Sequence, residues 1–252
     1  MKKSLLFFLI IAAQSLSATK YIHVVVALCD NVNQGIVPVP AKIGNGQDPA
    51  NNLYWGCGYG VKTFFKKQAE WKFIKLIKNP TTQILERLIF KHRDSTIYMI
   101  ADAYDGKEIK QSTLDFFAYS AGKNKFDIKI DSLTTVKAGG NADLICYVGH
   151  DGLMDFTLGA VFPPVDKKVR QTIALACYSK NFFAQHLKIT GAQPLLWSTH
   201  LMSPEAYTLD AAIDSWILKE KAEVTREKAA QAYNLYQKCG IKGARNLLVT
   251  GW

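Results

Sequence analysis

The sequence predicts an α/β protein, a three-layer sandwich in which helices cover both faces of a mainly parallel central sheet. Short and nearly continuous apolar runs recur along the chain, and such runs are typical of strands buried on both faces. Helical patterns separate several of these runs, which predicts right-handed β-α-β crossovers. The expected strands are residues 21–28, 95–103, 142–148, 172–176 and 194–199.

The first half of the chain starts with a strongly β-branched run at 21–28, which we expect to be the first and central strand. A connection over 30–60 follows that is rich in Gly, Pro and Asn, and its aromatic residues supply apolar area to hold it against the body. Residues 61–77 are predicted to form an amphipathic helix that Asn79-Pro80 ends. Residues 84–92 fit a short helix or a strand.

The second half continues the alternation of strands and helices. Residues 122–140 are polar, with a possible edge hairpin at 127–130, and Gly240 is expected to stop the last long helix. The apolar C-terminal residues 246–252 are predicted to dock on the body of the protein. The expected helices are residues 109–121, 180–187, 208–218 and 225–239.

Residues 1–18 have the pattern of a secretory signal peptide, with Lys2-Lys3 before a short apolar run and small or polar residues after it. Residues 19–252 are then expected to form one α/β domain, because a chain of 252 residues that is 48% hydrophobic can bury one substantial core. No later segment approaches about 20 apolar residues. We therefore expect an exported protein, periplasmic or secreted, without a stable membrane anchor after signal cleavage.

The basic residues are spread along the chain and do not form one block. Removing residues 1–18 removes two lysines and no acidic residue, so the formal net charge falls from +10 to +8. Scattered cations of this kind are typical of solvated helix faces. Since no nucleic-acid-binding module accompanies the charge, no nucleic-acid partner is expected.

Five cysteines follow the signal segment, an odd number, so at least one thiol stays free unless it pairs between chains. Cys29 and Cys57 flank one long loop and can bridge it, since export permits disulfides. Cys146 lies inside a strand pattern and is interpreted as a packed core thiol. Cys177 is the natural candidate for a free, reactive thiol.

Two neighbouring strand patterns each end in a group able to do nucleophilic chemistry. The run 142–148 is followed by Gly149 and His150, and the run 172–176 is followed by Cys177. Parallel neighbours would bring both side chains to the carboxyl edge of the sheet, where ligands bind in open α/β folds. An imidazole beside a thiol keeps a thiolate available, and backbone N–H groups near Gly152 can stabilise an oxyanion. Each residue alone is more often structural; the pairing favours catalysis.

These two runs, Leu-Ile-Cys-Tyr-Val-Gly-His-Asp-Gly at 144–152 and Ile-Ala-Leu-Ala-Cys at 173–177, resemble the core of the caspase-like cysteine peptidases, which include caspases, legumains, gingipains and clostripain. The resemblance implies a caspase–haemoglobinase fold, His150 as catalytic histidine and Cys177 as nucleophile. It also implies cleavage of peptide bonds with strong selectivity for one side chain before the cut. Together with the signal-peptide pattern, we expect an exported endopeptidase that acts on peptides or proteins through an acyl-enzyme. In this sequence Asp151 stands between His150 and Gly152, where the family usually has His directly followed by Gly.

Several further residues are candidates for the same site. By the resemblance to legumains, Asn31 or Asn33 is expected to support the histidine, while Asp151 and His200 are possible pocket residues. We expect no cofactor and no metal, and the oligomeric state stays open.

Two other classes of function compete with the peptidase. The first is a metal-dependent hydrolase that gathers His150, Asp151, Asp155 and His200, although no ligand pair of the type His-Glu-x-x-His is present. The second is a non-catalytic exported protein that binds a ligand, since a fold does not fix a function.

Overall fold

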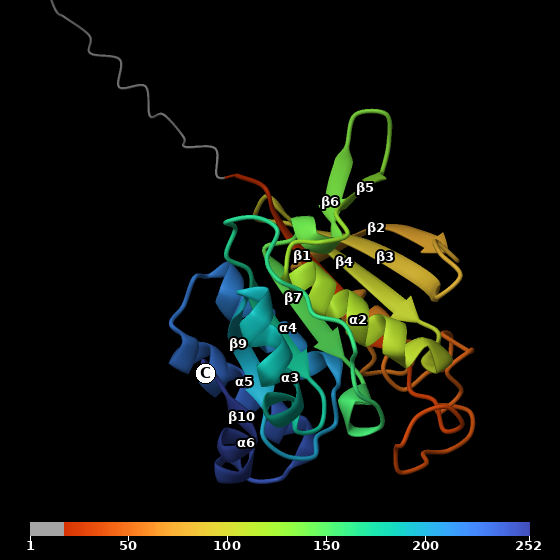
Figure 1. The fold of residues 1–252 in the computed structure, drawn as a ribbon, viewed down its shortest axis with the longest axis vertical. Coiled ribbons are helices and arrows are strands. Elements are labelled where there is room, and N and C mark those ends of the chain that lie inside the picture. Colours follow the sequence, from red (N-terminus) through yellow and green to blue (C-terminus); the bar gives the residue numbers. More distant parts are fainter. Residues whose placement is uncertain (1–17) are drawn as a thin grey trace, which may run out of the picture.

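The computed structural model describes residues 18–252, and its centre is one eight-stranded mixed sheet (Figure 1). The strand order is β10-β9-β8-β7-β1-β4-β3-β2, and the five strands from β9 to β4 run parallel. The predicted signal peptide lies outside the described residues except for Ala18. The parallel strands are β1 Lys20–Ala27, β4 Ile97–Tyr104, β7 Leu144–Val148, β8 Gln171–Leu175 and β9 Gln193–Ser198.

The antiparallel pairs lie toward the edges of this sheet. On one side β3 (Ile84–His92) and β2 (Trp71–Lys78) extend it, and on the other β10 (Leu248–Val249) pairs with β9. The short β10 confirms that the C-terminal segment docks on the body. A separate hairpin of β5 (Phe126–Lys129) and β6 (Thr135–Ala138) projects from the sheet (Figure 1), as its own two-stranded sheet.

Helices flank the sheet on both faces, which confirms the α/β class and is compatible with a three-layer sandwich. Helices α2 (Ile109–Ser120) and α3 (Ser179–Thr190) share a hydrophobic core with one face of the sheet. Helices α4 (Ala206–Ile217) and α5 (Ala222–Gln237) pack on the other face. The remaining helical segments are α1 Val61–Phe65, α6 Ile241–Leu247, and the 3₁₀ turns η1 Gly106–Glu108, η2 Gly139–Asn141 and η3 Gly152–Met154.

Strand β1 shows why the sheet is buried on both sides. Val24 and Val26 belong to the core beneath α4 and α5, whereas Val25 belongs to the core beneath α2 and α3. All three side chains are fully buried. Successive side chains of a strand point to opposite faces, so a strand between two helical layers is apolar at most of its positions. This confirms the prediction of β1 as a central strand.

The predicted helix over residues 61–77 is wrong beyond its first turn. Only Val61–Phe65 is helical, and Trp71–Lys78 forms the edge strand β2. A register shift between Phe73 and Lys75 interrupts the pairing with β3. Such a bulge breaks the alternation of apolar and polar residues that identifies a strand. The spacing of the apolar residues therefore resembled that of a helix. Residues 84–92, for which helix and strand both fitted, form β3.

The long connection after β1 has no regular helix or strand before Val61, as predicted, and is held down by aromatic side chains. Trp55 is fully buried, and its indole Nε1 donates to Glu86 Oε2 on β3 at 2.7 Å. Tyr54 is also buried. Burial of these rings fixes the loop beside the carboxyl edge of the sheet.

A buried polar group crosses the sheet between β3, β4 and β1. Asp102 receives two hydrogen bonds of 2.6 Å from Arg87, and His23 Nε2 lies 3.1 Å from its Oδ2. The Gly139 N–H donates to Nδ1 of His23, so Nε2 must carry the proton that faces Asp102. Every member of this group has a partner, which supports a structural role for His23.

Among residues 18–252, no helix combines the length and the apolar character that crossing a membrane requires.

Candidate active site

Strands β7 and β8 bring His150 and Cys177 to the same edge of the sheet. The two strands are parallel neighbours, with Val148 opposite Leu175 in the last pair of their register. His150 and Cys177 each follow two residues later in their own chain segment. The adjacency that the sequence predicted for these strands is therefore confirmed.

Gly149 makes the exit from β7 possible. Its φ of +147° is rarely adopted by residues with a side chain, and a Cβ there would lie 2.7 Å from the carbonyl oxygen of Ala27 on β1. The chain can thus turn tightly against β1 only with glycine at this position. This turn sets the direction in which His150 leaves the strand.

The His150 imidazole is oriented by a carboxylate that sequence reasoning did not assign to it. His150 is buried, with 6% of its surface exposed, and its Nε2 lies 2.8 Å from Asp155 Oδ2. The same oxygen accepts a hydrogen bond of 2.9 Å from the Gly35 N–H. A bond to a carboxylate places the proton on Nε2, so Nδ1 is the proton acceptor, and among residues 18–252 it has no hydrogen-bond partner.

The turn η3 explains how Asp155 returns to His150. Asp151 is the N-cap of this turn, and its Oδ1 accepts a hydrogen bond of 2.9 Å from the Leu153 N–H. The Asp155 N–H in turn bonds the Gly152 carbonyl. An Asp-Gly pair is a sequence signal for a capped turn. A turn at 151–152 brings Asp155 back toward His150, so this signal could have predicted their contact.

Cys177 is half-buried and bonded to the segment after β9. Its Sγ lies 3.4 Å from the Met202 nitrogen and 3.6 Å from the Met202 carbonyl oxygen. Burial raises the pKa of the thiol, the Met202 N–H opposes this, and the charge of Asp151 raises the pKa further. Among the described residues Cys177 makes no hydrogen bond to His150. The thiol thus lies at the edge of the sheet without a hydrogen bond to the imidazole.

Asp151 is the most unusual group of the site. It is fully buried, and its Oδ2 has no hydrogen-bond partner within the described part of the chain. Burial raises the pKa of this carboxyl to about 7, the Leu153 N–H opposes the rise, and the charge of Asp155 adds to it. The carboxyl is therefore close to half-protonated near neutral pH.

Gly152 lies in a crowded position, where an added side chain would displace the Phe156 ring. A Cβ on Gly152 would lie 2.6 Å from the ring of Phe156 and 3.2 Å from Ile109 on α2. Contact with these side chains explains the glycine without a substrate. A role for its backbone in holding an oxyanion stays a prediction.

The structure does not bring Asn31 or Asn33 to His150. Asn31 exchanges two hydrogen bonds with the Val39 backbone, and Asn33 Nδ2 donates to Asp30 Oδ2 at 2.8 Å. Both side chains thus stabilise the loop after β1. Asp155 holds the position that the resemblance suggested for an asparagine.

His200 follows β9, the strand next to β8, and is exposed. Its Nδ1 lies 2.8 Å from Thr199 Oγ1, and its carbonyl accepts a hydrogen bond from the Tyr178 N–H, one residue after Cys177. His200 therefore lies near the site at the same edge, with its ring bonded to its own neighbour.

Neither the ligand set of the metal-dependent alternative nor the expected disulfide is formed in the described part of the chain. Among residues 18–252, no group of three or more His, Cys, Asp or Glu side chains is arranged to hold a metal ion, so the ligand set of the metal-dependent alternative is not assembled. All five cysteines, which lie within the described range, are free thiols. The bridge between Cys29 and Cys57 is accordingly not formed in this structure.

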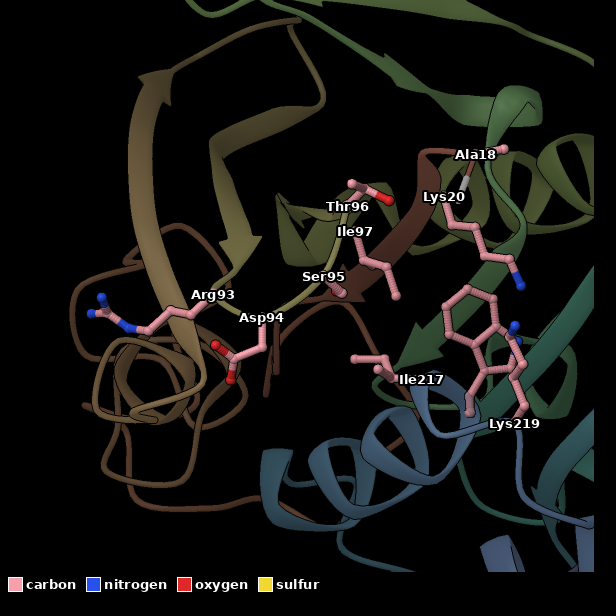
Figure 2. A pocket seen from close by; sticks show the side chains of 10 residues that line it. Ala18, Lys20, Arg93, Asp94, Ser95, Thr96, Ile97, Ile217 and Lys219 are labelled. Atoms are coloured by element: carbon pink, nitrogen blue, oxygen red, sulfur yellow. The ribbon is translucent and has the colours of Figure 1, made fainter. Parts of the chain in front are cut away.

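A cavity of about 510 Å³ lies at the opposite edge of the sheet. Figure 2 shows Lys20 and Ile97, the first residues of β1 and β4, on its wall together with Ile217 and Lys219 near the end of α4. These strand starts are the amino edge, whereas His150 and Cys177 follow strand ends. The cavity is therefore separate from the candidate active site.

Comparisons with protein-family models, with curated proteins and with solved structures find no match to this chain.

Proposed function

We propose that this protein is an exported, caspase-like cysteine endopeptidase that uses Cys177 as nucleophile and His150 as acid and base. The observation that carries the proposal is the placement of both residues at the ends of adjacent parallel strands. The order of the parallel strands, with helices on both faces, is compatible with the caspase–haemoglobinase fold that the sequence resembles.

The geometry of His150 supports this chemistry. Asp155 holds a proton on Nε2, which leaves Nδ1 to accept the proton of the thiol. The Cys177 thiolate would attack the carbonyl carbon of a peptide bond, and His150 would then protonate the leaving amine. Water activated by the same imidazole would release the acyl group from Cys177. Asp155 stabilises the imidazolium that forms in each step, as the third member of a triad does.

The absence of a thiol–imidazole hydrogen bond is compatible with this mechanism. Catalytic hydrogen bonds are often long or poorly aligned in free enzymes and shorten when the substrate binds. In this structure the Cys177 sulfur bonds Met202. Substrate binding would have to release that contact before the thiol can react.

One observation favours the alternative of a non-catalytic binding protein. Burial raises the pKa of the Cys177 thiol, whereas an activated nucleophile has a lowered one. If this state persists with ligand bound, Cys177 is structural.

Cleavage of a peptide library separates the two functions. If the protein is a cysteine peptidase, the wild type should cleave peptides and chelators should not affect the rate. Cleavage should be lost in Cys177→Ala and in His150→Ala. Cys239→Ala is the matched control, because it removes an exposed thiol elsewhere. No cleavage by the wild type, or equal cleavage by the wild type and Cys177→Ala, would contradict the proposal.

A further inference from the structure

Asp151 has a feature that its structural contacts do not explain. Capping η3 uses only Oδ1, which bonds the Leu153 N–H, and an asparagine oxygen would serve equally well. The second oxygen is fully buried and has no partner within the described part of the chain. A buried carboxylate without a compensating group is costly, so its presence next to His150 calls for a further role.

Asp155 is the one charged group among the described residues that shifts the pKa of Asp151. Asp155, from the same loop, raises the pKa of Asp151, and Asp151 in turn raises the pKa of Cys177, which follows β8, and of Tyr147 on β7. The imidazole of His150 is bonded to Asp155. No Lys or Arg within residues 18–252 is among the groups that shift the pKa of Asp151. Asp151 and Cys177 follow the paired strands β7 and β8, whose last register pair is Val148 and Leu175, so the buried carboxyl and the thiol lie at the same edge of the sheet.

We infer that Asp151 controls the reactivity of Cys177: its neutral form allows the thiolate to develop, and its ionised form suppresses it. Asp151 is thus a positioning residue that acts through the nucleophile. Its effect on thiol chemistry does not depend on the proposed peptidase function, whereas the effect on peptide cleavage rests on it.

The expected signature is a pH-dependent ratio of alkylation rates. The carboxyl of Asp151 has a pKa of about 7, so in the wild type its charge is absent at pH 5 and present at pH 8.5. In Asp151→Asn the charge is absent at both values. The ratio of the variant's rate to the wild-type rate should be close to one at pH 5 and should rise to roughly three- to tenfold above pH 8.

The experiment measures iodoacetamide alkylation of Cys177 from pH 5 to 9, with the modified cysteine located by peptide mass mapping. Site resolution is needed because Cys239 is exposed and Cys57 is partly exposed. Cys239 supplies an internal control, since its rate should be the same in both proteins. Asn at position 151 can keep the bond to the Leu153 N–H, so the variant is expected to fold.

A second variant tests the coupling directly. Asp155→Asn removes the neighbouring charge that raises the pKa of Asp151, so the inflection of the alkylation profile should move to lower pH. A ratio near one at every pH for Asp151→Asn would overturn the inference. Slower alkylation of that variant above pH 7 would also overturn it, because it would make Asp151 the base that removes the thiol proton.

Peptide cleavage gives the readout that depends on the proposed function. Asp151→Asn should extend the alkaline limb of the kcat/KM profile to higher pH than in the wild type. A variant that raises KM for peptides with lysine or arginine before the cut, with unchanged alkylation, would instead make Asp151 a binding group for basic side chains. If no peptide is cleaved by any form, the alkylation ratio still decides the role of Asp151.

Discussion

The Asp155 carboxylate joins the His150 imidazole to the backbone of Gly35. Its Oδ2 accepts hydrogen bonds from the imidazole at 2.8 Å and from the Gly35 N–H at 2.9 Å. One oxygen thereby ties the loop after β7 to the loop after β1. The orientation of the imidazole thus depends on two segments about 120 residues apart in the sequence.

Asp155→Asn is expected to lower kcat/KM by roughly 10²- to 10⁴-fold, because the amide no longer stabilises the imidazolium and can turn it to the wrong tautomer. The measurement is the rate of cleavage of the best library peptide. Asp94→Asn, an exposed carboxyl at the opposite edge of the sheet, is the control and should leave the rate unchanged. Wild-type rates in Asp155→Asn would remove Asp155 from the mechanism.

Gly35→Ala tests the same contact from the other side. A Cβ at residue 35 would lie 2.2 Å from Asp155 Oδ1, so the carboxylate must rotate away from its present place. We expect kcat/KM to fall about tenfold, with a Tm within about 2 °C of the wild type because residue 35 is exposed. Gly159→Ala, where nothing lies within 4 Å of the added atom, is the matched control. Equal kinetics for both variants would show that the Gly35 contact is dispensable.

The central strands could be predicted from the sequence because burial on both faces leaves a continuous apolar run. This held for β1, β7 and β8, and it placed His150 and Cys177 correctly on neighbouring strands. Edge strand β2 could not be predicted in the same way. It is only half covered, and the irregularity between Phe73 and Lys75 removes the alternation that would have identified it.

The partners of the site residues were harder to predict than their positions. The resemblance to legumains suggested Asn31 or Asn33 as the residue that supports His150, but both side chains bond within the loop after β1. The partner of a loop side chain depends on how the loop closes, and the periodicity of the sequence does not encode this. The role of Asp155 follows from a short capped turn, for which the Asp-Gly pair at 151–152 was the local signal. That one oxygen of Asp151 is buried without a hydrogen-bond partner in the described part of the chain follows only from the three-dimensional packing, and no sequence pattern indicates it.

Asp151→Asn is expected to stabilise the fold at alkaline pH. The folded-state pKa of Asp151 is raised to about 7, so the carboxyl's contribution is fully present below its unfolded pKa near 4 and is lost as pH rises through 7. We compare the free energy of unfolding of the variant with that of the wild type at each pH. This difference should be about 1 to 4 kcal/mol more favourable to the variant at pH 8 than at pH 4. Urea unfolding at both pH values measures this. A difference that does not vary with pH would mean that folding leaves the pKa of Asp151 at its unfolded value.

Asp102→Asn is expected to destabilise the protein by about 3–5 kcal/mol, because it leaves the buried Arg87 guanidinium without its counter-charge. Burial opposes ionisation of Asp102, but Arg87 and His23 hold its pKa below the ordinary value. The contribution of the ionised carboxylate is therefore present above about pH 4 and is lost as pH falls through the lower folded-state pKa. Urea unfolding at pH 7 checks the size of the loss. A loss under about 1 kcal/mol would show that Arg87 finds another partner.

If Cys177 and His150 act together on a peptide carbonyl, an electrophile presented by a peptide should label Cys177 in a reaction that needs His150. A set of peptidyl acyloxymethyl ketones, with all side chains represented next to the ketone, is incubated with the wild type and with His150→Ala. Adducts are then located by mass mapping. We expect a thioether on Cys177 of the wild type, formed at least about 10²-fold faster than in the variant. Labelling of Cys177 at equal rates in both proteins, or no labelling of Cys177 by any member, would contradict it.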